Sequence, residues 1–246
     1  MSKSKVNIIF IVISLLLFFL FWYNLLQIDI GEEFKTVLSL MTFLFAVFTG
    51  FFISRQGQRY SSMRDYIADF DGEMTTIYRQ SRHLSPTMKN KIENIIKKEY
   101  KKIIILGHWD VPFVLKSKLI IDIHATLDGF RKKEKLNPIE NVVLTRIFVA
   151  TAGMQRARKR VISLGNENIP TLQWVVIILL ATMLILLLNG LQTPTILFGT
   201  IVKAIFATVV LLTLLMLKKF DDLSFFEVSV GDTSARDVLG IMAGKK

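Results

Sequence analysis

The chain has 246 residues, carries a formal net charge of +11 and contains no cysteine. The lack of cysteine excludes disulfides, thiolate zinc sites and a cysteine nucleophile. Hydrophobic residues make up 52% of the chain and are concentrated near its two ends, whereas the middle is strongly polar. This distribution indicates membrane spans on either side of a polar domain.

The first apolar run covers residues 6–26 and is long enough to cross a hydrocarbon core of about 30 Å as a helix. A cleaved signal peptide is the alternative, but its apolar region is shorter and ends in small residues. Here the run ends in Trp22 and Tyr23, which are typical of a membrane interface, so we predict a retained span. A second run, residues 37–53, follows after a short loop, and the two predict a transmembrane hairpin over residues 1–54.

Residues 55–169 are predicted to form a helical cytoplasmic domain. Apolar residues recur at intervals of three and four over residues 60–77, which predicts an amphipathic helix that runs out of the second span. Similar stripes over residues 92–103 and 139–161 predict further helices. Such stripes bury against one another in a helical bundle or pack between subunits, and the sequence does not separate these alternatives.

Two more apolar runs, residues 172–188 and 195–217, are joined by a short link of turn-forming residues. They predict a second transmembrane hairpin over residues 170–218, followed by a cytoplasmic tail, residues 219–246. The predicted fold is therefore an all-α membrane protein with four transmembrane helices in two hairpins and a helical cytoplasmic domain between them.

The distribution of basic residues predicts the orientation in the membrane. Residues 54–169 contain 22 Lys and Arg against 12 Asp and Glu, whereas the loops that join the spans carry no positive excess. The positive-inside rule places the middle domain and both termini in the cytoplasm. Topology thus explains the net charge, and because no nucleic-acid-binding motif is present we expect no nucleic-acid partner.

No residue spacing points to catalysis. The three histidines, His83, His108 and His124, do not occur in a metal-ligand spacing, and neither a phosphate-binding loop nor a nucleophile elbow is present. Asp221 and Asp222 directly follow the last span and could bind a cation, but the lysines beside them favour a solvated boundary. We expect no enzymatic activity, no cofactor and no bound metal.

Two features inside the predicted spans are candidates for function. Phe43, Val47 and Phe51 step by four along one face of the second span. This face is either a lipid-facing or helix-packing surface, or part of a constriction in which apolar rings from several subunits gate ions by dewetting. Lys203 lies inside the fourth span, where it is either functional or extends to the outer interface.

The order of the parts and three short motifs resemble one known group of proteins. The first motif is Gly50-Phe51-Phe52-Ile53-Ser54 followed by Arg59-Tyr60, the second is Arg156, Arg158 and Arg160 followed by Ile169-Pro170 and Trp174, and the third is Phe220-Asp221-Asp222 followed by Phe225 and Val228-Ser229. These features are similar to the bestrophin superfamily, and most like its bacterial bestrophin-like family of unassigned function. The tail departs from that pattern, because it has few acidic residues among lysines and Leu223-Ser224 replaces a Pro-Phe step. We therefore expect no calcium gating.

The resemblance implies a homo-oligomeric ion channel, a pentamer in the bestrophins, in the plasma (inner) membrane of a bacterium. Phe43, Val47 and Phe51 would then form the pore neck, and Arg59, Tyr60 and Lys203 are candidates for the pore or the subunit interface. The expected partners are other copies of the chain, membrane lipid and permeating ions, with anions slightly favoured by the basic cytoplasmic domain. The alternative is a non-conducting membrane scaffold or signalling protein whose cytoplasmic helices bind a partner.

Overall fold

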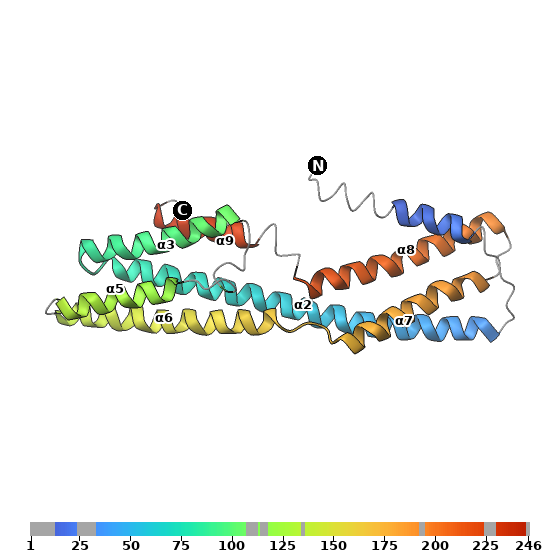
Figure 1. Cartoon of the computed structure of the whole chain (residues 1–246), viewed down its shortest axis with the longest axis horizontal. Coiled ribbons are helices and arrows are strands. Elements are labelled where there is room, and N and C mark those ends of the chain that lie inside the picture. Colours follow the sequence, from blue (N-terminus) through green and yellow to red (C-terminus); the bar gives the residue numbers. More distant parts are fainter. Residues whose placement is uncertain are drawn as a thin grey trace. The chain divides into compact units, whose positions relative to one another are not determined.

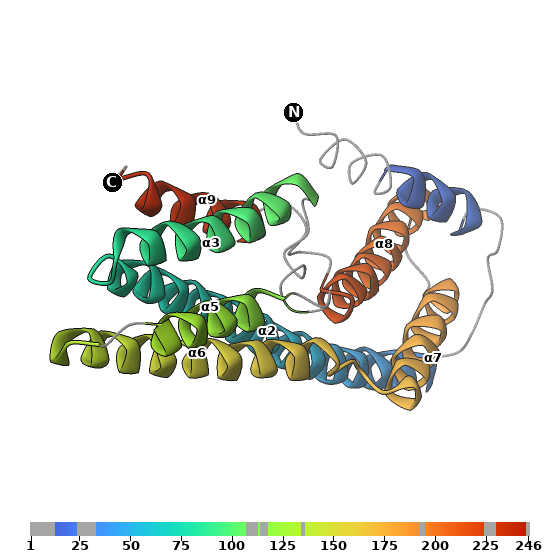
Figure 2. The same cartoon turned by 60° about the vertical axis from the view of Figure 1, so that its left-hand side comes forward.

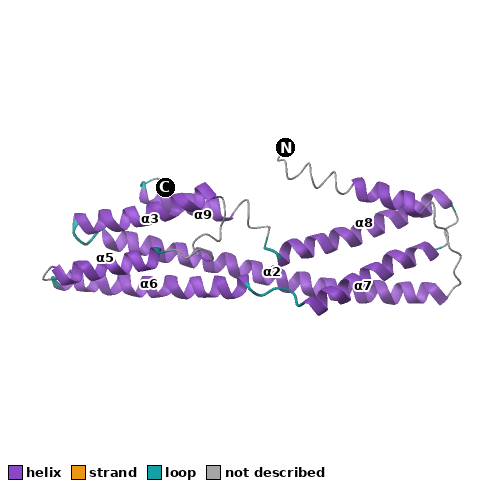
Figure 3. Ribbon diagram, viewed as in Figure 1, coloured by secondary structure: helices purple, strands orange, loops and turns teal. Residues whose placement is uncertain are grey.

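The computed structural model describes residues 13–23, 33–106, 113, 118–133, 136–191, 195–223 and 230–244. In these residues all regular secondary structure is helical, which confirms the predicted all-α class (Figures 1 and 3). The chain divides into two compact units. The membrane unit comprises Met1–Gly57 and Asn168–Asp222, and the polar unit comprises Gln58–Glu167 and Leu223–Lys246.

The membrane unit contains apolar helices of membrane-spanning length. Helix α2 is Glu33–Ser81, α7 is Thr171–Leu187 with a short 3-10 helix Leu188–Gly190 after it, and α8 is Ile196–Asp221. These three are long and apolar enough to cross a bilayer, and the chain is a membrane protein. The first predicted span is described only over the apolar helix Ile13–Tyr23, and its remainder lies outside the described residues. The four-span topology therefore stays a prediction.

The interior of the membrane unit is made by side chains from several helices. Phe45 and Phe52 of α2 pack with a cluster from α7 and α8 that includes Ile177, Leu184 and Leu217. A second cluster joins the Ile13–Tyr23 helix to α8 through fully buried alanines at positions 204 and 207. Small residues let helices approach closely, and close packing drives helix association in lipid, where the hydrophobic effect contributes little.

The polar unit is a helical bundle with one apolar core. It contains the second half of α2 together with α3 (Pro86–Leu106), α5 (Leu119–Lys133), α6 (Pro138–Gly165) and α9 (Val230–Met242). The predicted stripes supply much of this core, which includes Met63, Ile67, Phe70, Met74, Ile77, Ile92, Ile96, Tyr100, Ile103, Ile147, Met154 and Val161. Ile139, the first residue of the third stripe, is 69% exposed at the start of α6 and lies outside this core.

Two local features of this bundle were not predicted. Helix α6 begins with a capping box, in which the Asn137 side chain accepts from the Glu140 amide at 2.7 Å and the Glu140 carboxylate accepts from the Asn137 amide at 2.8 Å. In the tail, α9 lies along α3 (Figure 2) and buries Ala235, Val238 and Met242 in the core. The tail is therefore partly folded into the bundle.

We expect Ile147→Ala to destabilise the polar unit, because Ile147 is fully buried in its core. The lost transfer free energy and the cavity left behind together cost about 2–5 kcal/mol. Thermal unfolding of the purified protein, followed by circular dichroism, checks this. Ile105→Ala in the same unit is the matched control and should stay within about 0.5 kcal/mol of the wild type, since Ile105 is 81% exposed on α3. Equal losses in both variants would contradict the burial pattern.

Candidate functional site

The predicted neck residues form an exposed apolar row on α2. Phe43, Val47 and Phe51 are 64%, 51% and 60% exposed, whereas Phe45 and Phe52 on other faces of α2 are buried in the membrane unit. Residues four apart lie above one another on a helix, so the three side chains share one face. The described residues leave this row exposed, so it is open to lipid or to another copy of the chain. The assignment of the row to a pore stays a prediction.

The threonine hydroxyl groups near this row are satisfied within α2 itself. Thr42 donates its Oγ1–H to the Leu38 carbonyl at 2.8 Å, and Thr49 donates to the Phe45 carbonyl at 2.6 Å. A threonine that bonds to the carbonyl four residues earlier has already used its single donor. The row on α2 is thus an apolar surface, chemically suited to a dewetting constriction or to lipid contact.

A buried carboxylate joins three helices of the membrane unit. The side chain of Asp221, at the end of α8, is 8% exposed and accepts a hydrogen bond from the Ile169 amide at 2.7 Å. It also accepts from Trp174 Nε1 of α7 at 3.0 Å and from Gln56 Nε2 of α2 at 3.4 Å. The predicted solvated boundary is wrong for Asp221, because these donors take the place of water around its carboxylate. Asp222 is exposed, as predicted.

Gln56 is a site residue that the sequence analysis missed. Its side chain is buried, although glutamine is mostly exposed in folded proteins. A weak signal was available, because Gln56 lies four residues after Phe52 and therefore on the same side of α2 as that buried ring. A polar residue on the buried face of a membrane helix indicates a polar partner on a facing helix, which here is Asp221.

Arg59 caps the end of α6 within the polar unit. Its side chain is buried and donates from Nε to the Leu164 carbonyl at 2.7 Å and from Nη2 to the Gly165 carbonyl at 3.0 Å. The last carbonyls of a helix have no partner inside the helix, so a guanidinium group in this place is favourable. Tyr60 is half-buried against the core of the same unit. A role of either residue in the pore or the subunit interface stays a prediction.

Lys203 extends toward the turn that joins α7 and α8. Its ammonium group donates to the Asn189 carbonyl at 3.3 Å, and its side chain is half-buried. The long aliphatic stem allows the charge to reach the end of a span while the backbone lies inside it. This geometry supports the anchoring interpretation, and a role in the pore or interface stays a prediction.

The described part of the chain holds no group of three His, Asp or Glu side chains arranged to bind a metal ion. His124 lies beside the ring of Phe148, with 5.5 Å between the ring centroids. His108 and the tail residues Phe225, Glu227 and Val228-Ser229 lie outside the described residues. With no metal-binding group among the described residues, the candidate site consists of the apolar row on α2 and the Asp221 carboxylate.

Comparison with known proteins supports the resemblance found in the motifs. A family model for the Bestrophin-like domain matches residues 8–223. A mutant form of a bacterial Bestrophin homolog from Klebsiella pneumoniae is similar in structure, with a TM-score of 0.71 at 14% sequence identity over 95% of this chain and 99% of that chain. A second mutant form of that homolog gives a TM-score of 0.68 at 15% identity over 96% and 99% of the two chains. None of the curated protein sequences matches this chain.

We expect Asp221→Ala to destabilise the membrane unit, because the Ile169 amide and Trp174 Nε1 then lose their acceptor. Each buried donor left unsatisfied costs about 1–3 kcal/mol. The measurement is the midpoint of thermal unfolding in detergent, with Asp222→Ala as the matched control. Because Asp222 is exposed, its variant should unfold like the wild type. A wild-type midpoint for Asp221→Ala would show that these hydrogen bonds do not hold the helices together.

Proposed function

This chain belongs to the bestrophin-like family, and on that premise we propose that it assembles as a homopentamer around an ion-conducting pore. The proposed topology has four spans in the plasma (inner) membrane of a bacterium, with the polar unit and both termini in the cytoplasm. Conduction is passive. The positive charge of the polar unit raises the local concentration of anions and thereby favours them slightly over cations.

The observation that carries this proposal is the exposed row Phe43, Val47 and Phe51. Its spacing is that of the neck in the bestrophins, which the chain resembles. When several copies surround an axis, such rows form stacked apolar rings, and a narrow apolar passage excludes water unless it widens. The row also lies on α2, the helix that continues from the membrane unit into the polar unit. Movements of the polar unit can therefore reach the neck through a single helix.

A non-conducting scaffold is the second candidate, and exposed apolar residues on the polar unit favour it. Ile139, Val142 and Val149 are 69%, 55% and 61% exposed on α6, outside the apolar spans. Their spacings of three and seven residues place them on one face of that helix. Such an exposed apolar face on a polar domain is typical of a protein-binding surface. In a scaffold this partner is a different protein, whereas in a channel it is a neighbouring copy of the chain.

The test of channel function is the ionic current of purified protein in planar bilayers. Replacing Phe43, Val47 and Phe51 together by alanine should raise the current or the open time several-fold, because smaller side chains let water into the neck. The matched control is the triple alanine variant at Phe198, Val202 and Ile205, an exposed apolar row on α8. The control should conduct like the wild type, since this row is proposed to face lipid.

The mass of the oligomer is measured on the same samples. Altered currents in the α2 variant at unchanged mass support the neck. A well-folded oligomer that stays silent under varied voltage, pH and calcium contradicts the channel and favours the scaffold. Equal changes in both triple variants would show that the effect comes from membrane packing and not from a neck.

A further inference from the structure

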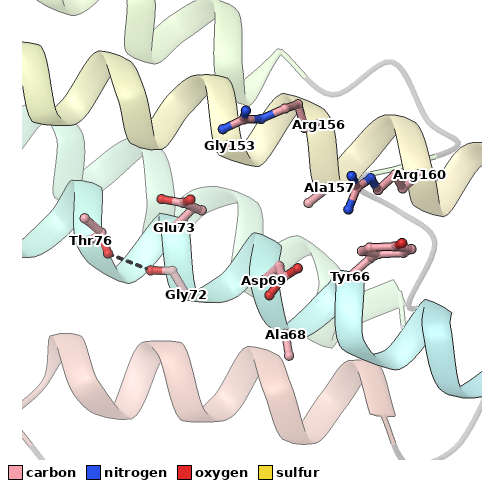
Figure 4. Close-up of a pocket in the computed structure, with 10 residues that line it drawn as sticks. All are labelled: Tyr66, Ala68, Asp69, Gly72, Glu73, Thr76, Gly153, Arg156, Ala157 and Arg160. Atoms are coloured by element: carbon pink, nitrogen blue, oxygen red, sulfur yellow. Dashed lines mark hydrogen bonds between the residues drawn. The ribbon is translucent and has the colours of Figure 1, made fainter.

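A charged groove lies between α2 and α6 in the polar unit (Figure 4). Its volume is about 600 Å³, and small residues such as Gly72 and Gly153 line part of it. Asp69 and Glu73 contribute carboxylates from α2, while Arg156 and Arg160 contribute guanidinium groups from α6. The groove belongs to the polar unit, whereas the row Phe43, Val47 and Phe51 belongs to the membrane unit, and the proposed neck does not use it.

The two helices carry opposite charges in matching rows. Asp69 and Glu73 are one helical turn apart, and so are Arg156 and Arg160, so each pair lies on one face of its helix. The described residues provide no salt bridge or hydrogen-bonded partner for any of these four charged groups. The groove therefore contains two positive and two negative side chains, on opposite helices, that do not form ion pairs with one another (Figure 4).

Packing holds two of these groups in place. The Arg160 guanidinium lies over the ring of Tyr66, 5.0 Å from its centroid, which restrains it by a cation–π contact. Glu73 lies so close to α6 that a Cβ at Gly153 would overlap its carboxylate. Burial raises the pKa of Glu73 above its ordinary value, and the positive charge of Arg156 opposes this rise. A further cation beside Glu73 would stabilise the ionised carboxylate.

We propose that this groove binds a small zwitterion of the amino-acid class, with its ammonium group at Glu73 and Asp69 and its carboxylate at Arg156. A simple anion would meet repulsion from the α2 carboxylates, and a simple cation would meet repulsion from the α6 guanidinium groups. A molecule that carries both charges satisfies both rows, and a guanidinium fork matches the geometry of a carboxylate. This binding is independent of conduction and goes beyond the proposed channel.

The experiment is titration calorimetry on the purified full-length protein in detergent. The probes are glycine, β-alanine and 6-aminohexanoate, which separate the two charges by increasing distances, together with methylamine and acetate, which carry one charge each. At least one zwitterion should bind roughly tenfold or more tightly than methylamine and acetate. Each of these two probes lacks one of the two charged groups that would form hydrogen bonds in the groove. The preferred chain length then reports the distance between the two charged rows.

Variants identify the groups that bind. Glu73→Gln and Arg156→Gln should each weaken binding of the preferred zwitterion by roughly tenfold or more. Arg146→Gln is the matched control, because Arg146 is also exposed on α6 but does not line this groove. It should bind like the wild type. Should a glutamine variant fail to assemble, Glu73→Asp and Arg156→Lys are measured instead. These variants keep the charge but withdraw it from the bound molecule, and they are expected to weaken binding as well.

Several outcomes would overturn the proposal. Acetate binding as tightly as the zwitterions, with no loss in Glu73→Gln, would make the groove a plain anion site. Preference for glycerophosphoethanolamine over every amino acid would assign the groove to a lipid headgroup. Absence of binding by any probe at millimolar concentration would also reject the proposal. If the oligomer mass then changed in Glu73→Gln or Arg156→Gln, the groove would be a contact between subunits.

Discussion

A bilayer offers no water to polar groups, so a membrane helix must satisfy its hydrogen bonds within the protein. The membrane unit follows this constraint closely. Thr49 bonds to its own helix, Tyr23 donates to the Ile185 carbonyl at 2.9 Å, and Lys203 donates to the Asn189 carbonyl at 3.3 Å. The described buried side-chain atoms without a partner in this unit are Trp22 Nε1, Gln173 Oε1 and Asn189 Oδ1. All three lie close to helix ends and not in the middle of a span.

The Asp221 carboxylate is costly to bury under this constraint, and three donors satisfy it. A buried charge is tolerated only when hydrogen bonds replace its hydration, and here an amide, an indole and a side-chain amide do so. Since the donors come from separate segments, the carboxylate fixes the end of α8 against α2 and the start of α7. The rotation of α2 within the membrane unit, and with it the direction of the Phe43 row, depends partly on this contact.

Periodicity and hydropathy were sufficient to predict the apolar helices α2, α7 and α8 and the apolar stripes that line the core of the polar unit, because each depends on a pattern along one helix. They were insufficient for Asp221, whose burial depends on the Ile169 amide far away in the sequence. Arg59 is a similar case, since its partners are carbonyls at the end of α6. Helix α9 was missed although its buried residues Ala235, Val238 and Met242 recur at intervals of three and four, which is a helical pattern. The sequence showed that Phe43, Val47 and Phe51 share one face of α2, but it did not show whether lipid or another copy of the chain covers that face.

Exposure has a different meaning in the two units. Lipid tails are as apolar as phenylalanine, so the exposed Phe43 row costs little in a bilayer and creates little pressure to assemble. On the polar unit, burying an exposed apolar side chain would stabilise the protein by about 25 cal/mol per Å² of apolar surface removed from water. Val142 and Val149, exposed on α6, therefore provide a stronger drive toward a protein partner than the Phe43 row does. If that partner is another copy, the polar units hold the oligomer together, and the α2 rows are brought around one axis as a consequence.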